Sequence, residues 1–171
     1  MKKLKLYLDT SAIGYLDEQS NPKEMNDMLI LWDQIKQGRY DAIVSQVTLG
    51  ELSSNLNTDK VRVLFEFLSE ISYATVDVDV EVKKVAALVK TNGLLISDKC
   101  EADRLHIGCA VAHDCDVLVS FNFKHLVNVQ TIKGVRAISN LCGYGNIDIM
   151  PAAMLIEKGE DLSDSSGSQG S

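Results

Sequence analysis

Four polar side chains in this chain have the types and positions that metal-dependent phosphodiester chemistry requires. Each follows the carboxyl end of an expected strand, directly or one to two turns into the next helix; they are Asp9, Glu51, Asp103 and Asn122. In an open α/β sheet, that edge is where ligands bind. Three carboxylates that meet there repel one another by several kcal/mol unless a cation lies between them. Such hard oxygen ligands suit Mg²⁺ or Mn²⁺.

The residue types predict a role for each member of this group. Asp9, Glu51 and Asp103 would hold one or two divalent ions, which position and deprotonate a water for in-line attack on phosphorus. Asn122 would bind a metal-bound water or a phosphate oxygen as a neutral ligand. Three carboxylates and one amide can hold one ion, and a second ion would bind weakly.

Neighbouring residues are expected to support the site. Thr10 and Ser11 lie where their hydroxyls can orient the Asp9 carboxylate by hydrogen bonds. Four flanking side chains are candidates for holding the substrate backbone, and ordinary surface charge explains each about as well; they are Lys99, Arg104, Lys124 and His125.

Each of the four central residues also has an ordinary explanation when it is taken alone. Asp9 could be only a helix N-cap, and Glu51 a solvated helix residue. Asp103 could simply pair with Arg104, and Asn122 could be a turn former after a strand. Their joint placement at one sheet edge favours a shared site.

Composition limits the class of protein. The 171 residues, 46% of them hydrophobic, suit one domain, which we expect at residues 1–152, with a polar, disordered tail at 153–171. The sequence has no apolar run of about 18 residues, so we expect no membrane span. Its apolar start is too short for a signal peptide, so we expect a cytoplasmic protein. The net charge of −7 argues against a broad nucleic-acid-coating surface, although the last fifteen residues carry −3 of it.

The four cysteines do not suggest a disulfide framework. Cys100 and Cys109 would lie roughly 13 Å apart along one helix, too far to bridge, so we expect four reduced, mostly buried thiols. His106, Cys109 and His113 share one face of that helix at a spacing that could seat zinc. The apolar surroundings favour core packing instead.

Periodicity predicts alternating strands and helices, and therefore a three-layer α/β domain. Strands are expected at residues 4–8, 41–45, 72–76, 117–120, 135–138 and 147–150. Helices are expected at residues 26–37, 46–56, 58–70, 78–91 and 98–113.

Four segments resemble the motifs of the PIN domain family in order and spacing. They are Leu-Asp-Thr-Ser-Ala-Ile, Thr-Leu-Gly-Glu-Leu, Ala-Asp-Arg-Leu-His-Ile-Gly-Cys-Ala and Leu-Val-Ser-Phe-Asn-Phe-Lys-His-Leu-Val-Asn. The ending resembles that of VapC-like proteins, so the likeness covers nearly everything before the tail. It implies a three-layer α/β/α PIN-like fold with a central, mostly parallel sheet.

The resemblance also implies a function. It indicates a Mg²⁺- or Mn²⁺-dependent endoribonuclease, commonly the toxin of a toxin–antitoxin pair, that acts on single-stranded RNA or a tRNA loop. Such proteins are typically homodimers neutralised by a small antitoxin. Asp9, Glu51 and Asp103 match the family's acids, Asn122 falls where many relatives carry a fourth acid, and His125 stands near a further aspartate position.

Two alternatives remain open from the sequence. A PIN nuclease could act in RNA processing without an antitoxin, and a neighbouring reading frame for a short DNA-binding protein would favour the toxin instead. A degenerate PIN domain could bind RNA or a protein without cleaving, which the amide at Asn122 and the negative net charge favour.

Overall fold

The alternating segment Leu4–Leu8 forms β1, the central strand of a five-stranded sheet in the computed structural model, which describes residues 2–156. The sheet order is β3-β2-β1-β4-β5, and every pairing is parallel. The other strands are β2 (Tyr40–Ser45), β3 (Tyr73–Val76), β4 (Val117–Val119) and β5 (Asp148–Met150). Parallel strands place all their carboxyl ends at one edge, where ligands bind in such sheets.

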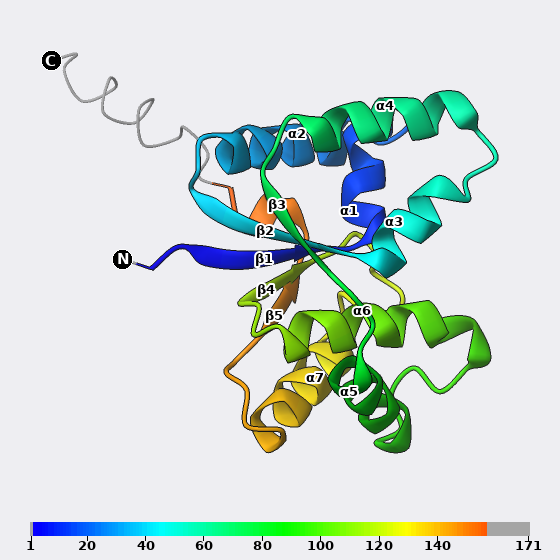
Figure 1. Ribbon diagram of the computed structural model, residues 1–171, viewed down its shortest axis with the longest axis vertical. Coiled ribbons are helices and arrows are strands. Elements are labelled where there is room, and N and C mark those ends of the chain that lie inside the picture. The colour runs from blue at the N-terminus through cyan, green and yellow to red at the C-terminus, as the bar shows by residue number, and fades with distance from the viewer. Residues whose placement is uncertain (1, 157–171) are drawn as a thin grey trace, which may run out of the picture.

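Helices cover both faces of the sheet, which confirms the three-layer α/β/α architecture (Figure 1). One layer holds α1 (Thr10–Gly14), α2 (Pro22–Lys36), α3 (Gln46–Ser53) and α4 (Thr58–Ser69). The other holds α5 (Val80–Thr91), α6 (Glu101–Ala112) and α7 (Val129–Leu141). Short 3₁₀ turns lie at Tyr15–Asp17, Asp98–Cys100 and Ala152–Met154.

The strand alternation divides the interior into two cores, because successive side chains point to opposite faces of a sheet. Leu6 and Leu8 pack with the helices of the first layer, whereas Tyr7 packs with α5, α6 and α7. β4 is buried on both faces, as its continuous apolar run predicts. The sheet is thus fixed between two helical layers, and its carboxyl edge opens between them.

The predicted strand at residues 135–138 is wrong, because these residues lie within α7. Asn128 caps this helix by accepting a hydrogen bond from the Thr131 amide. The buried residues Val135 and Ile138 are three apart, which is helical spacing. Their β-branched side chains favour a strand locally, but the cap and the buried helical face decide the outcome.

The remaining boundaries differ by small amounts. α2 begins at Pro22, four residues before the predicted start, since proline suits the first helical turn. α3 ends at Ser53 rather than at residue 56. Ile156 is buried in the first core, so the ordered chain continues past residue 152. The rest of the expected tail, residues 157–171, lies outside the described residues.

Two further expectations concern cysteines and membranes. All four cysteines are free thiols, and three of them are buried, as predicted; Cys142 is half-buried. Within residues 2–156, none of the helices has the length and apolar character needed to cross a membrane.

Candidate active site

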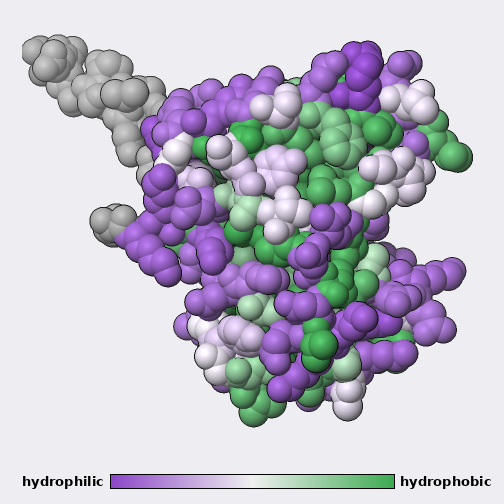
Figure 2. Space-filling view, in the orientation of Figure 1, coloured by the Kyte–Doolittle hydropathy of each residue, from purple (hydrophilic) through white to green (hydrophobic). Residues whose placement is uncertain are grey.

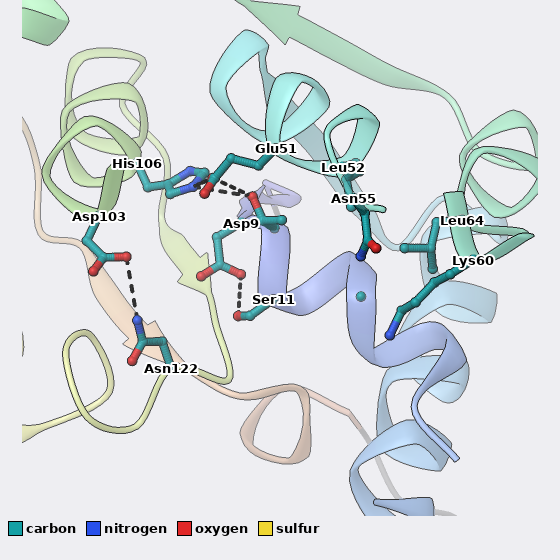
Figure 3. Close-up of a pocket in the computed structure, with 12 residues that line it drawn as sticks. Asp9, Ser11, Glu51, Leu52, Asn55, Lys60, Leu64, Asp103, His106 and Asn122 are labelled. Carbon is teal, nitrogen blue, oxygen red and sulfur yellow. Dashed lines mark hydrogen bonds and ion pairs between the residues drawn. The ribbon is translucent and has the colours of Figure 1, made fainter. Parts of the chain in front are cut away.

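The carboxyl edge of the sheet carries a pocket of about 350 Å³ that all four predicted central residues line. Asp9 follows β1, Glu51 lies on α3, Asp103 lies in the first turn of α6, and Asn122 follows β4. The molecule is hollowed at this edge, between the two helical layers (Figure 2). The close-up shows that the side chains of Asp9, Glu51 and Asp103 enter this space from three sides (Figure 3).

Asp9 is held rigidly at the floor of the pocket, where it is 3% exposed. It caps α1, and its Oδ1 accepts hydrogen bonds from the Ala12 amide at 2.8 Å and the Ser11 hydroxyl at 2.7 Å. Ser11 in turn accepts the Phe121 amide at 2.9 Å, so the end of β4 fixes the hydroxyl that orients Asp9. Ser11 therefore lies where the sequence places it, against the Asp9 carboxylate.

The electrostatics of Asp9 suit a cation ligand. Burial raises the pKa of the Asp9 carboxyl above its ordinary value. The charge on His106 and hydrogen bonds from Ser120, Ser11 and the Ala12 amide lower the pKa, but they do not offset the burial. A buried carboxylate of this kind needs a positive partner to remain ionised at low cost.

Glu51 is turned toward His106 rather than toward Asp9. Its Oε1 lies 2.6 Å from Nε2 of His106 and accepts the Thr10 hydroxyl at 2.7 Å. Thr10 thus orients Glu51, not Asp9 as the sequence predicts. Burial raises the pKa of Glu51, but the hydrogen bonds from His106 and Thr10 and the His106 charge outweigh it, so the pKa lies below its usual range.

A buried hydrogen-bond chain holds His106 in place. Nδ1 of His106 lies 2.6 Å from the Tyr7 hydroxyl, which lies 2.6 Å from the Ser45 hydroxyl. If Tyr7 donates to Nδ1, that nitrogen carries no proton and Nε2 donates to Glu51, whereas in the charged imidazolium both ring nitrogens donate. Through Tyr7, His106 therefore links the pocket to the second core.

Asp103 and Asn122 meet at the opposite wall of the pocket. Nδ2 of Asn122 lies 3.5 Å from Oδ1 of Asp103, while its Oδ1 accepts the His125 amide at 3.0 Å. The amide oxygen is thus occupied, and Asn122 presents its nitrogen to the site. Asn122 can donate a hydrogen bond to a phosphate oxygen or a carboxylate here, whereas its oxygen is directed at the His125 amide.

The four residues expected to flank the site have different placements. Lys99 and Lys124 are exposed. His125 contacts Asp103, with its Nδ1 3.1 Å from Oδ2. Arg104 is buried, and its guanidinium donates to the carbonyls of Leu95 and Ser97. Arg104 therefore anchors the loop before α6 and is not brought to the pocket.

The structure adds three polar lining residues that the sequence analysis missed. His106 was assigned to the core, although it is one helical turn after Asp103 and on the same face, which was the available signal. Asn55 and Lys60 lie at the other end of the pocket (Figure 3). Nothing in the sequence indicated them, because the turn between α3 and α4 brings them there.

The zinc site considered for α6 does not form. His106 contacts Tyr7 and Glu51, while Cys109 packs in the second core. Burial raises the pKa of the Cys109 thiol to about 11, and Nε2 of His113 is buried without a hydrogen-bond partner. Cys109 packs in the interior, as the apolar surroundings predict, whereas His106 also lines the pocket.

The donor set fits a hard divalent ion. Three carboxylates line one polar pocket, and the most buried of them has no full counter-charge beyond His106. Such oxygens are the ligands of Mg²⁺ and Mn²⁺. An ion shared by all three would require the Glu51 side chain to turn its second oxygen inward, because the ligand atoms of the three acids do not form a group within 4.8 Å among the described residues.

Comparison with known proteins finds one matching family model and similar solved structures. The family model described as PIN domain matches residues 6–129. A solved structure of DNA-bound VapBC from Salmonella typhimurium is 17% identical, with a TM-score of 0.53, covering 87% of this chain and 98% of that one. VapBC2 from Rickettsia felis, bound to a promoter fragment, is 18% identical with a TM-score of 0.52, covering 71% and 90%. Among curated proteins, none matches the chain.

Proposed function

Since the chain belongs to the PIN domain family, we propose that it is a Mg²⁺- or Mn²⁺-dependent endoribonuclease that hydrolyses RNA phosphodiester bonds. The observation that carries this proposal is the convergence of Asp9, Glu51, Asp103 and Asn122 on one pocket at the carboxyl edge of the sheet. Residues separated by up to 113 positions in the chain meet there. Their oxygen donors match the ions that phosphodiester hydrolysis uses.

The side chains would have different roles in such a site. An ion held by Asp9, Glu51 and Asp103 would supply Lewis-acid stabilisation and a more acidic bound water. Ser11 fixes the Asp9 carboxylate, and His106 fixes one oxygen of Glu51, leaving the other free to turn.

Two further side chains face the substrate in this proposal. Asn122 donates from Nδ2 and can hold a phosphate oxygen beside Asp103. Lys60 supplies a cation at the far end of the pocket for the next phosphate of the strand, although it also lies 3.5 Å from Glu18. The acids therefore form a reaction centre, and Lys60 forms a contact that sets the position of the strand.

We further propose that the protein is the toxin of a type II toxin–antitoxin pair and that it forms a homodimer in the cytoplasm. Support comes from the two similar structures, which are VapBC complexes. Co-expression with the product of a short neighbouring reading frame tests the partner. Copurification of the two proteins with loss of cleavage would support the toxin, whereas a nuclease unaffected by that product would indicate RNA processing.

The direct test of the activity uses a mixed pool of single-stranded RNA and tRNA. Wild type, Asp9→Asn and the control Asp33→Asn, an exposed acid on α2, are compared in Mn²⁺, Mg²⁺ and EDTA. Cleavage by wild type and control that needs metal and is lost in Asp9→Asn is expected. Equal cleavage by Asp9→Asn, or cleavage in EDTA, would contradict the proposal.

One observation favours a second candidate, an RNA- or protein-binding module without cleavage. Among the described residues, the ligand atoms of Asp9, Glu51 and Asp103 do not form a group within 4.8 Å, so one ion would bind all three only after side-chain rearrangement. RNA binding that persists in EDTA, with no cleavage in either metal, would favour this module.

A further inference from the structure

We propose that Cys100, Asp103 and His125 form a second metal site, for a thiophilic divalent ion such as Zn²⁺. One ligand atom from each residue lies within 4.8 Å of the others. Across residues 2–156, this is the one group of His, Cys, Asp and Glu side chains that meets this condition. The site adjoins the carboxylate pocket and shares Asp103 with it.

The separations between the donor atoms match a coordination shell. Sγ of Cys100 lies 3.9 Å from Nδ1 of His125, and Oδ2 of Asp103 lies 3.1 Å from the same nitrogen. Tetrahedral zinc with typical bond lengths would separate sulfur from nitrogen by about 3.5 Å, and nitrogen from oxygen by about 3.4 Å. These two separations are therefore within half an ångström of the spacing that an ion would impose, and the sulfur and the carboxylate oxygen lie within 4.8 Å of each other.

A catalytic relay does not explain the same contacts. In a nucleophile–histidine–carboxylate triad, the nucleophile and the acid contact different ring nitrogens. Here Cys100 and Asp103 both face Nδ1 of His125. Three donors that converge on one point suit an ion, whereas they cannot pass a proton through the ring.

The backbone holds the three ligands in position before an ion binds. Cys100 and Asp103 are three residues apart at the start of α6, so they share a helix face. The His125 amide donates to Asn122 at 3.0 Å, and its carbonyl accepts the Thr131 hydroxyl at 2.9 Å. Only small side-chain shifts are therefore needed for coordination.

The donor set selects the class of ion. A thiolate, an imidazole and a carboxylate are a mixed set that zinc accepts and that magnesium does not. Cys100 is buried, while the side chains of His125 and Asp103 are 33% and 18% exposed, so a fourth position can hold water. Binding releases the thiol proton of Cys100 to solvent.

Sharing of Asp103 couples this site to the nuclease, a consequence that rests on the proposed function. Zn²⁺ on Oδ2 of Asp103 neutralises a carboxylate that the Mg²⁺ or Mn²⁺ ion needs, and it adds positive charge beside that ion. Zn²⁺ therefore inhibits Mn²⁺-dependent cleavage, and Cys100→Ser relieves the inhibition.

Cobalt spectroscopy of the reduced full chain tests the site without any cleavage assay. Co²⁺ bound to wild type should give a sulfur-to-cobalt charge-transfer band that Zn²⁺ abolishes. Cys100→Ser should remove the band and weaken Zn²⁺ binding by more than the roughly 10–100-fold cost of disturbing a supporting partner. The control Cys142→Ser, a half-buried thiol outside the group, should keep both.

Two results would overturn the proposal: no charge-transfer band in folded wild type, or the same band in Cys100→Ser. Asp9→Asn separates this proposal from the nuclease, because it should abolish cleavage and keep the band. Thermal unfolding of each variant confirms that a missing band does not come from an unfolded chain.

Discussion

Nε2 of His106 lies 2.6 Å from Oε1 of Glu51, and this contact crosses the pocket from α6 to α3. It joins the two helical layers that flank the sheet, and through Tyr7 it connects the candidate site with the second core. His106 is almost fully buried, whereas Glu51 faces the pocket. His106 therefore acts as a positioning residue for Glu51.

Two substitutions at His106 separate its contacts. Asparagine can reproduce Nδ1 and keep the contact with Tyr7, whereas glutamine can reproduce Nε2 and keep the contact with Glu51. We expect His106→Asn to lower the cleavage rate by roughly 10-fold, as loss of one charge-assisted hydrogen bond predicts, and His106→Gln to retain most of it. Rates at varied Mn²⁺ measure both. Equal rates for the two variants would show that His106 does not act through Glu51.

Asp9→Asn should stabilise the protein when no metal is present. Burial raises the pKa of Asp9 in the folded state, so the folded state binds this proton more tightly than the unfolded chain does. The free energy of unfolding therefore falls as pH rises from the unfolded pKa through the folded pKa. The variant avoids this loss, and each kcal/mol gained would raise Tm by roughly 2–4 °C.

Thermal unfolding in EDTA between about pH 4 and pH 8 checks this prediction. The gain should be largest at the neutral end and shrink at the acid end. Glu51→Gln is the matched control with the opposite sign, because the pKa of Glu51 is lowered and its contribution is lost as pH falls through the folded pKa. A destabilised Asp9→Asn at neutral pH would contradict the electrostatic account.

Asn122→Asp should strengthen metal binding. The new carboxylate keeps an acceptor for the His125 amide and turns its other oxygen to Asp103, where the amide nitrogen now lies at 3.5 Å. Without metal the two carboxylates repel, so the metal-free Tm should fall. We expect the Mn²⁺ concentration for half-maximal cleavage to fall several-fold, equivalent to about 1 kcal/mol. An unchanged metal requirement would place the ion away from Asn122.

Lys60→Ala should weaken substrate binding more than turnover. Lys60 lies at the end of the pocket opposite Asp103 (Figure 3), so its loss should remove the proposed phosphate contact and leave the reaction centre intact. KM should rise several-fold with kcat little changed, and the slope of log affinity against log salt should decrease by about 1. Lys36→Ala is the control, since that lysine pairs with Glu70 outside the pocket. The same change in KM and in salt dependence for both variants would indicate a general effect of surface charge and not a phosphate contact at Lys60.

The sequence predicted the parts of the fold that local patterns encode. Apolar alternation identified β1, and side-chain capping identified the start of α1 at Asp9. The same approach failed at residues 135–138, where β-branched residues indicate a strand but the buried face of α7 requires a helix. Tertiary packing decided this element, and packing is not visible in a short window.

The site was predictable to the extent that topology fixes it. Strand ends placed the four central residues at one edge, but they could not show that Glu51 turns toward His106 or that Arg104 turns away. These orientations depend on partners far apart in sequence. The Cys100–His125 contact, which joins residues on either side of β4, was hidden for the same reason.

The central claim is that Asp9, Glu51 and Asp103 hold one Mn²⁺ or Mg²⁺ ion, and crystals soaked in Mn²⁺ test it most directly. Anomalous scattering should show one strong peak among the three carboxylates of wild type, and no peak there in Asp9→Asn. A peak that persists in Asp9→Asn, or an absence of any peak at this edge of the sheet in wild type, would contradict the account.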